Sequence, residues 1–431
     1  MRALRLAVLA ALPLIVSACR SDAPTRAADS AGAGVAAGVA AGVAAGVADT
    51  APGCAPPPLA ELARLPAQPG LPDPFAFSDG RRAATHADWA CRRTQLATQI
   101  QHVELGPIPG PAPVQASVAD DGRDKTLTLR IAHEGKTIDI PVKIQLPAGG
   151  RPPYPAMIGL GAVTLNNDEL ARMGVALVSF PNGLVAEQKD AGSRGKGGFY
   201  ALYGASHPAG AMSAWSWGVS RLVDALEATP TAGIDATRLG ITGCSRNGKG
   251  AIVAGAFDTR IRLTIAQESG SGGAAGWRVS DDQRAAGENV QTLGQIVTEN
   301  VWFRDSFRQF GAHAQQLPFD QHAVMSLIAP RGLLVIENTS MEWLGNRSAW
   351  VTSLAARETW KALGAQDAMG VAQVGGHPHC RLPVSQYGYV NAFVRKFLLN
   401  DAAADTRVME TDGGFAPTPG SWVKWSTPAL R

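Results

Sequence analysis

The stretch Gly243-Cys244-Ser245-Arg246-Asn247-Gly248-Lys249 decides the fold of this chain. It follows a short apolar run at 239–242 and precedes a run of small, apolar residues at 251–256. This context predicts a strand, a sharp turn and a helix. A serine between close glycines at such a turn is typical of a nucleophile elbow. The tight bend there exposes the hydroxyl and directs backbone N–H groups at the reacting oxygen.

The spacing of this stretch leaves two other interpretations to consider. It departs from G-x-S-x-G, because Gly248 comes one residue later than that pattern requires. A phosphate loop, G-x-x-x-x-G-K-[ST], fits from Gly243 to Lys249 but fails at Gly250, where the hydroxyl that binds a metal ion is missing. A glycine-rich turn with a chance serine is the third interpretation. The local pattern favours the elbow.

Composition limits the class of protein. The chain has 431 residues and 45% hydrophobic residues, enough for a large core in one or two domains. The net charge of +3 gives no argument for a nucleic-acid partner, and none is predicted.

The N-terminus has the features of an export signal. Arg2 and Arg5 precede an apolar run at 6–16, and Cys19 follows small residues, as in the lipobox of bacterial lipoproteins. We expect a lipoprotein-type signal peptide at 1–18 and a lipid anchor on Cys19. The protein would be a periplasmic or outer-membrane lipoprotein of a bacterium, or a secreted protein.

A low-complexity linker is expected at 19–53, and a single catalytic domain at 54–431. The uncharged run at 31–48 has the length of a transmembrane helix, but it lacks Leu, Ile and Phe, so a flexible linker is preferred. In the domain, we expect a hairpin at 126–131 and 136–146 and a helix at 88–103. Further buried strands and helices are expected at 156–160, 175–180, 217–226, 239–242, 263–266, 332–336 and 393–399.

Alternating short apolar strands and helices predict a mostly parallel sheet covered on both faces. Together with the serine turn, this pattern predicts an α/β-hydrolase, a three-layer αβα sandwich. Apart from Cys19, four cysteines remain, an even number that suits disulfides in an exported protein. Cys54–Cys91 would tie the N-terminal arm to the first helix, and Cys244–Cys380 would join two segments far apart in sequence.

A serine nucleophile needs a base, and the base needs an orienting acid. His377 and His379 lie shortly before the last predicted helix, where hydrolases of this plan carry the base. A Cys244–Cys380 disulfide would hold the two Cα atoms about 4.4–6.8 Å apart. This would bring His379 within reach of Ser245, so His379 is the predicted base and His377 a support of its loop.

Three glutamates are candidates for the acid. Glu268 follows the strand at 263–266, and the carboxyl ends of such strands are where sites lie in open α/β sheets. Glu337 and Glu342 follow the strand at 332–336, which is the more usual position in hydrolases. The residues alone leave this choice open.

Several motifs together resemble one family, the glucuronoyl esterases of carbohydrate esterase family fifteen. They extend over most of the chain and occur in the family's order. They are Thr242-Gly243-Cys244-Ser245-Arg246-Asn247-Gly248-Lys249-Gly250 and those at 71–75, 215–221, 267–273, 317–320, 329–332, 343–345 and 379–380. The resemblance implies cleavage of esters between lignin alcohols and the carboxyl of 4-O-methyl-glucuronic acid on xylan.

The resemblance also assigns roles to residues. It makes Ser245 the nucleophile, His379 the base and Glu268 the acid, and its pattern includes the Cys244–Cys380 disulfide. Some bacterial members carry an alternative acid where this chain has Met341, which favours Glu268. Arg246 follows the serine, where a guanidinium can stabilise the oxyanion.

Four further residues match positions that bind the sugar: Lys249, Gln291, Glu299 and Trp343. Gln291 and Glu299 are eight residues apart, which predicts that they share one helix face. No metal-ligand spacing and no cofactor fingerprint is present, so no metal or cofactor is predicted.

The expected partner is a glucuronoxylan or lignin–carbohydrate ester, and the expected state is a monomer. Another cell-wall serine esterase, acting on acetyl or feruloyl xylan, or a peptidase, is one alternative. A non-catalytic carbohydrate-binding lipoprotein is the other.

Overall fold

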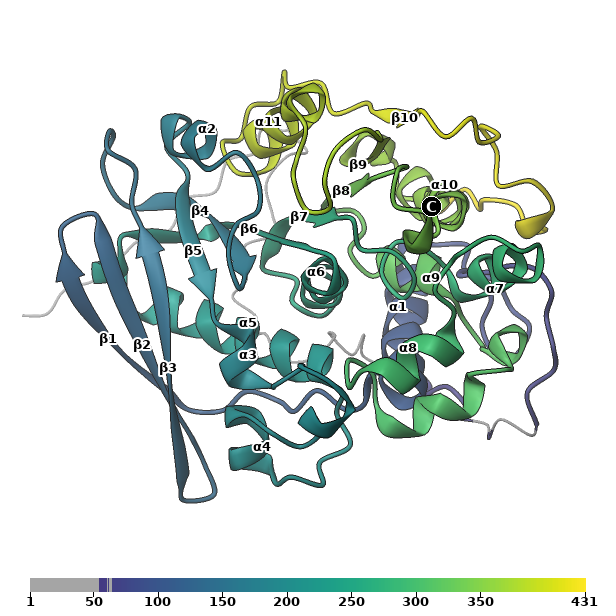
Figure 1. Ribbon diagram of the computed structural model, residues 1–431, viewed down its shortest axis with the longest axis horizontal. Coiled ribbons are helices and arrows are strands. Elements are labelled where there is room, and N and C mark those ends of the chain that lie inside the picture. Colours follow the sequence, from purple (N-terminus) through teal and green to yellow (C-terminus); the bar gives the residue numbers. More distant parts are fainter. Residues whose placement is uncertain (1–53, 60, 62–63) are drawn as a thin grey trace, which may run out of the picture. The chain divides into compact units, whose positions relative to one another are not determined.

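The structure is a computed structural model that describes residues 54–59, 61 and 64–431 (Figure 1). The predicted signal peptide at 1–18, the lipid site at Cys19 and the linker at 19–53 lie outside the described residues. All described residues belong to one unit, Ala44–Arg431.

A ten-stranded sheet organises the described part of the chain, in the order β1-β2-β3-β5-β4-β6-β7-β8-β9-β10. The first three strands pair antiparallel, and β3 pairs antiparallel with β5; from β5 to β10 every pairing is parallel. The sheet confirms the predicted mostly parallel α/β architecture. The strands are β1 Val114–Asp121, β2 Asp124–His133, β3 Lys136–Gln145, β4 Tyr154–Leu160, β5 Ala176–Phe180, β6 Ile234–Cys244, β7 Ile261–Gln267, β8 Gly332–Glu337, β9 Met369–Gln373 and β10 Met409–Thr411.

Helices connect the strands and cover the sheet (Figure 1). They are α1 His86–Ile100, α2 Asn167–Arg172, α3 Asn182–Val185, α4 Gly198–Tyr203, α5 Ala211–Ala228, α6 Arg246–Phe257, α7 Trp277–Ala285, α8 Leu293–Glu299, α9 Gln321–Ser326, α10 Asn346–Ala362 and α11 Tyr387–Phe397.

Both faces of the sheet are buried, and strand β8 shows how. Leu333 and Val335 belong to the larger core, which contains residues of α5, α6, α9 and α10. Leu334 and Ile336 belong to a second core, which contains residues of α2 and α11. Since successive side chains of a strand point to opposite faces, this alternation places the sheet between two helical layers. The predicted three-layer arrangement is therefore present.

The sequence pattern missed β1, β9 and β10 and misplaced the last helix. Strand β1 is an edge strand whose side chains are half-buried or exposed, so it lacks the apolar run that marks a buried strand. Its pairing with β2 decides its conformation. Helix α11 begins at Tyr387, before the predicted start at 393. Its first turn contains Gly388, a poor helix former that hides the helical pattern in the sequence.

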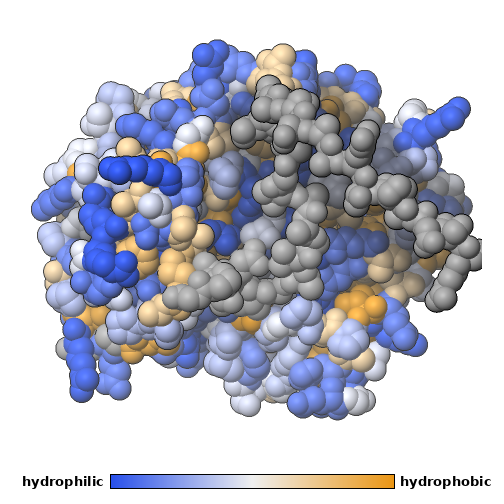
Figure 2. Space-filling model, turned by 180° about the vertical axis from the view of Figure 1, so that it is seen from behind, coloured by the Kyte–Doolittle hydropathy of each residue, from blue (hydrophilic) through white to orange (hydrophobic). Residues whose placement is uncertain are grey.

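The surface of the described residues carries few large apolar side chains. Leu59, Leu184 and Val384 are the exposed ones. Figure 2 shows polar and apolar residues interspersed on the face that it displays. Among the described residues, no helix combines the length and hydropathy needed to cross a membrane.

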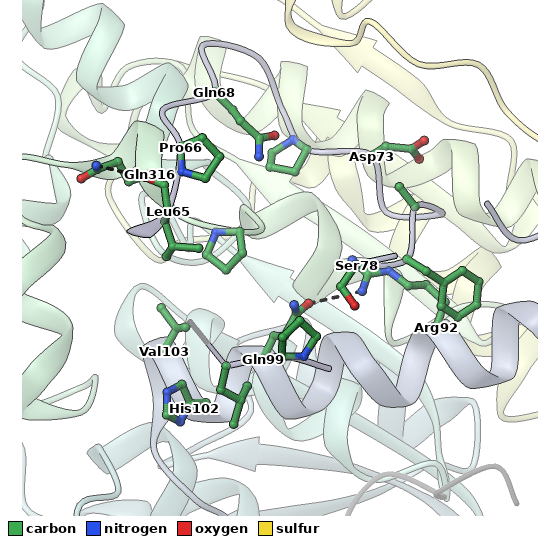
Figure 3. A pocket seen from close by; sticks show the side chains of 16 residues that line it. Leu65, Pro66, Gln68, Asp73, Ser78, Arg92, Gln99, His102, Val103 and Gln316 are labelled. Carbon is green, nitrogen blue, oxygen red and sulfur yellow. Dashed lines mark hydrogen bonds between the residues drawn. The ribbon is translucent and has the colours of Figure 1, made fainter. Parts of the chain in front are cut away.

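A cavity of about 390 Å³ lies between the N-terminal segment and helix α1 (Figure 3). Its polar lining includes Arg92, Gln99 and His102. None of the predicted site residues lines this cavity.

A buried carboxyl follows α1. Glu104 lies in a π-helical turn, Gln101–Leu105, and is 1% exposed. Its Oε1 accepts a hydrogen bond of 2.7 Å from Gln321 Nε2. Burial raises the pKa of Glu104 to about 8, and the nearby Asp320 carboxylate also raises it. Glu104 therefore stays protonated at neutral pH, when the unfolded chain would ionise it.

Replacing this carboxyl by an amide tests its protonation. Native Glu104 retains its proton up to about pH 8, whereas the unfolded residue loses it near 4.5, so wild-type stability falls as pH rises through this window. Glu104→Gln removes this dependence. Relative to wild type, its free energy of unfolding should rise by up to about 1.4 kcal/mol per pH unit between these values. Urea denaturation at pH 5, 6.5 and 8 measures the difference, and a constant difference would contradict the buried proton.

Candidate active site

Ser245 lies on a strained turn between β6 and α6. Its backbone has φ 60° and ψ −128°, a conformation that is uncommon for a residue with a side chain and that clusters at functional sites. The Ser245 N–H donates to the Gln267 carbonyl, at 2.9 Å, and the Gly248 N–H donates to the Ser245 carbonyl, at 2.8 Å. The predicted strand, turn and helix are present.

Two glycines explain the unusual spacing of this turn. A Cβ on Gly243 would lie 2.4 Å from the Asn247 carbonyl oxygen, and one on Gly248 would lie 2.7 Å from the Gln267 carbonyl oxygen. Both distances are shorter than real Cβ contacts. The chain therefore needs glycine at 243 and 248 for close packing. This holds although the two glycines are one residue further apart than in G-x-S-x-G.

The environment of Lys249 argues against the phosphate-loop alternative. Its side chain is 4% exposed, and its ammonium donates to the Ser269 carbonyl. Burial lowers the pKa of Lys249 to about 8, while the carboxylates of Glu337 and Glu299 oppose this shift. The lysine lies inside the protein rather than in an open loop that could surround a phosphate.

The structure brings together the predicted base and acid. His379 Nδ1 lies 2.6 Å from Glu268 Oε2, and the Cys380 N–H donates to Glu268 Oε1 at 3.0 Å. The Glu268 side chain is fully buried, whereas that of His379 is 28% exposed. Because a carboxylate only accepts hydrogen bonds, Nδ1 carries a proton here. This leaves Nε2 as the nitrogen that can take a proton from a nucleophile.

The other two acid candidates have different partners. Glu337 accepts hydrogen bonds from the Ser269 N–H and hydroxyl, and Glu342 accepts one from the Asn289 N–H at 2.9 Å. The geometry thus selects Glu268 from the three glutamates that the sequence left open.

His377 lies in the loop before His379 and bonds within its own surroundings. Its Nε2 lies 2.9 Å from the Val374 carbonyl, and its Nδ1 lies 3.3 Å from Asn338 Nδ2. These contacts fit the supporting position that the sequence suggested for it.

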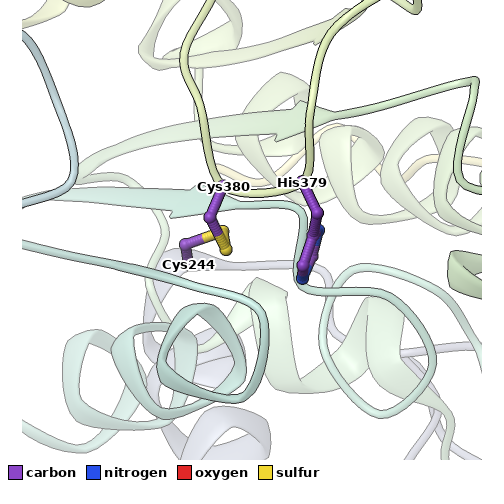
Figure 4. Close-up of side chains that lie close together, drawn as sticks. All are labelled: Cys244, His379 and Cys380. Carbon is purple, nitrogen blue, oxygen red and sulfur yellow. A yellow bond between two sulfur atoms is a disulfide. The ribbon is translucent and has the colours of Figure 1, made fainter.

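Both predicted disulfides are formed. Cys54–Cys91 has a Cα–Cα distance of 5.5 Å and Cys244–Cys380 one of 5.6 Å. Cys244 and Cys380 adjoin Ser245 and His379, so the second bond fixes the nucleophile turn against the base loop (Figure 4).

The same cysteines make the one group of possible metal ligands found among the described residues. A ring nitrogen of His379 and the sulfurs of Cys244 and Cys380 lie within 4.8 Å of one another. Both sulfurs belong to the disulfide, so neither can offer a thiolate to a metal ion.

Arg246 is exposed and points to a pair of residues that the sequence did not single out. Its NH1 donates to Gln188 Oε1 at 3.4 Å, and its guanidinium carbon lies 5.8 Å from the centre of the Trp302 ring. The Trp302 indole N–H donates to the same Gln188 oxygen at 3.1 Å. Lys249 Nζ lies 5.7 Å from the Trp302 ring. No motif or spacing connects Gln188 and Trp302, which are 114 residues apart.

The remaining predicted residues form a group beside the histidine. Gln291 Nε2 donates to Glu299 Oε2 at 2.8 Å, and the Gln291 N–H donates to the Trp343 carbonyl at 3.1 Å. The Trp343 and His379 rings lie 4.8 Å apart in an edge-to-face arrangement. One premise was wrong: Gln291 and Glu299 do not share a helix face, because α8 begins at Leu293, after the cap residue Thr292. The loop before the cap turns Gln291 back to Glu299.

This fold and site define a serine-dependent carboxylic ester hydrolase of the α/β-hydrolase class. A family model described as "Glucuronyl esterase, fungi" matches residues 129–364. The 4-O-methyl-glucuronoyl methylesterase of Hypocrea jecorina is 46% identical over 361 residues, which are 84% of this chain and 76% of the relative. The chain belongs to the glucuronoyl esterase family.

Solved structures agree with this assignment. The glucuronoyl esterase catalytic domain from Hypocrea jecorina is 44% identical, with a TM-score of 0.80 over 85% of this chain and 98% of that chain. A serine-to-alanine mutant of the glucuronoyl esterase from Sporotrichum thermophile has the same TM-score at 40% identity, over 85% of this chain and 97% of that chain. That mutant is in complex with methyl 4-O-methyl-β-D-glucopyranuronate.

The close packing at Gly248 can be tested by adding a single methyl group. Gly248→Ala should push the turn away from the Gln267 carbonyl, destabilise the protein by about 1–3 kcal/mol and lower esterase activity at least about tenfold. Gly388 of α11 is the matched control, since a Cβ there meets nothing within 4 Å. Gly388→Ala should leave activity unchanged. Thermal melting and initial rates measure both effects, and a fully active, stable Gly248→Ala protein would refute the packing argument.

Proposed function

We propose that this protein hydrolyses the ester between 4-O-methyl-D-glucuronic acid of glucuronoxylan and alcohols, including lignin alcohols. The observation that carries the proposal is the 2.6 Å contact between Glu268 and His379, which the disulfide fixes beside the Ser245 turn. The name of the Hypocrea relative and the glucuronate ester bound to the Sporotrichum mutant support the choice of substrate.

The proposed mechanism is a two-step acyl transfer. His379 Nε2 takes the proton of the Ser245 hydroxyl, whose oxygen attacks the ester carbonyl. Glu268 holds the ring through Nδ1 and stabilises the imidazolium that forms. His379 then gives the proton to the leaving alcohol, and the uronoyl group remains on Ser245. Water, deprotonated by the same histidine, hydrolyses this acyl-enzyme.

The oxyanion of each tetrahedral intermediate needs hydrogen-bond donors. We assign this role to Arg246 and to backbone N–H groups at the start of α6. Arg246 is held by Gln188 and lies against Trp302, which limits the directions in which its guanidinium can point. Each step uses groups of the chain itself, and no cofactor or metal ion is proposed.

Recognition of the sugar is assigned to Lys249, Gln291, Glu299 and Trp343. Gln291, Glu299 and Trp343 form one group beside His379, and Lys249 lies near the Trp302 ring that also contacts Arg246. Amide, carboxylate, ammonium and indole groups suit the hydroxyls of a sugar ring, and a flat indole suits its apolar face. Specificity would therefore come from the uronate side of the ester.

A comparison of esters tests the proposed activity. Benzyl glucuronate should be hydrolysed with a higher kcat/KM than benzyl acetate or a feruloyl ester, because acetyl and feruloyl groups carry no sugar hydroxyls for the assigned residues to bind. Ser245→Ala should lower kcat by at least about 10⁴-fold. Ser421→Ala, at an exposed position, is the control and should keep wild-type activity. Preference for acetyl or feruloyl esters, or an active Ser245→Ala protein, would contradict the proposal.

We also propose an exported, monomeric protein with a lipid anchor. Residues 1–18 would be the signal peptide, Cys19 would carry the lipid, and 19–53 would link it to a catalytic domain at 54–431. The two disulfides suit an oxidising compartment outside the cytoplasm. The relatives named above are fungal, so a bacterial source with periplasmic or outer-membrane attachment depends on the lipobox resemblance at Cys19 alone.

The anchor can be tested on the mature protein. Mass spectrometry of the N-terminal peptide, after expression in a bacterium with lipoprotein processing, should show a chain that begins at Cys19 with added acyl groups. Cys19→Ala should abolish this modification and release the protein from the membrane fraction, since a lipid chain is the proposed attachment. An unmodified N-terminus at another residue would exclude lipidation at Cys19.

A further inference from the structure

Glu337 is a buried carboxyl for which the mechanism above has no use. It is the last residue of β8 and is fully buried. Its Oε1 accepts hydrogen bonds from the Ser269 N–H and hydroxyl, both at 2.9 Å, and from the Gly270 N–H at 3.3 Å. Its Oε2 has no hydrogen-bond partner among the described residues. A carboxyl buried in this way costs free energy, which raises the question of what it supplies.

Ser269 connects Glu337 to the active site on two sides. On one side it directly follows Glu268, whose φ of 46° places it in a conformation rare for a residue with a side chain. On the other side its carbonyl accepts a hydrogen bond from the Lys249 ammonium. The hydrogen bonds between Glu337 and Ser269 therefore fix the position of one short segment. This segment contains Glu268 and the Ser269 carbonyl that accepts the hydrogen bond from Lys249.

The charges around Glu337 are complementary. Burial raises the pKa of Glu337 to about 7, and Glu268 also raises it, while the Ser269 and Gly270 donors and the Lys249 ammonium lower it. Burial lowers the pKa of Lys249 to about 8 and Arg246 also lowers it, while the carboxylates of Glu337 and Glu299 raise it. Between these two values, Glu337 carries a negative charge and Lys249 a positive one.

We propose that Glu337 is a positioning residue for ester hydrolysis, which holds the Ser269–Gly270 turn so that Glu268 meets His379 and Lys249 faces the sugar. The inference rests on the proposed function. In this role, one buried carboxyl positions two parts of the site: the Glu268–His379 pair and the sugar-binding Lys249. This role also accounts for a glutamate at the usual hydrolase acid position that does not contact the histidine.

Glu337→Gln tests this role, because the amide keeps the shape and one acceptor oxygen but removes the charge. The ratio of wild-type to variant kcat/KM for benzyl glucuronate should depend on pH. It should be small below about pH 6, where wild-type Glu337 is protonated, and largest between about 7 and 8. Above about 8 it should fall again, as Lys249 loses its proton.

The size of the effect follows from a charge-assisted hydrogen bond. Loss of such a bond costs about 1.5–3 kcal/mol, so the ratio should reach about tenfold or more near pH 7.5. In the variant, kcat should fall because Glu268 no longer holds His379 in position. KM should rise because Lys249 no longer faces the sugar. In a double-mutant cycle with Lys249→Met, the two losses should be less than multiplicative, because both act through Ser269.

Glu104→Gln is the matched control, since it also replaces a buried glutamate that has one partnered and one unpartnered oxygen. Its kcat/KM should follow the wild-type pH profile. If Glu337→Gln does not fold, Lys249→Met carries the test by itself. Without the ammonium, Glu337 should titrate at higher pH, so the acidic limb of the kcat/KM profile should move upward.

The outcomes separate this inference from the proposed function. A wild-type protein that does not cleave benzyl glucuronate would overturn the function. If the wild type cleaves it, the inference fails when Glu337→Gln loses less than about twofold at pH 7.5, or loses the same factor at every pH. It also fails when the cycle with Lys249→Met is fully multiplicative, or when the acidic limb of Lys249→Met does not move.

Discussion

The buried carboxylate of Glu268 is the interaction on which the site depends. A charge with no exposure to solvent must be compensated by hydrogen bonds, and Glu268 receives them from His379 Nδ1, from the Cys380 N–H and from the side-chain amides of Gln267 and Asn338. The two shortest of these bonds, at 2.6 and 3.0 Å, come from one loop, which the Cys244–Cys380 disulfide attaches to the nucleophile turn. The carboxylate therefore fixes the histidine ring and the loop that carries it.

The parallel sheet explains why these groups meet. Ser245, Glu268 and Glu337 follow or end the neighbouring strands β6, β7 and β8, and the carboxyl ends of parallel strands lie at one edge of the sheet. The usual acid position at β8 holds Glu337, which bonds to Ser269 instead of the histidine. Two adjacent strands thus supply two buried glutamates with different partners.

Much of this could be predicted from the sequence, because the signals are local. The glycines around Ser245 indicate the turn, the strand and helix alternation indicates the sheet, and an even set of four cysteines suggests the two disulfides. Long-range contacts gave no such signal. Gln188 and Trp302 hold Arg246 only because distant loops meet, and strand β1 forms only because β2 provides its hydrogen-bond partners.

The sequence by itself determined the α/β-hydrolase plan and the serine turn, since these depend on spacing and on residue type. An even set of cysteines suggested disulfides, and the tertiary structure decided that Cys244 pairs with Cys380 by bringing them together. Tertiary structure decided which glutamate serves His379. Glu268 and Glu342 follow strands and Glu337 ends one, and only their positions in space distinguish them. It also decided the protonation of Glu337 and Lys249, because burial and nearby charges shift a pKa and neither can be read from sequence order.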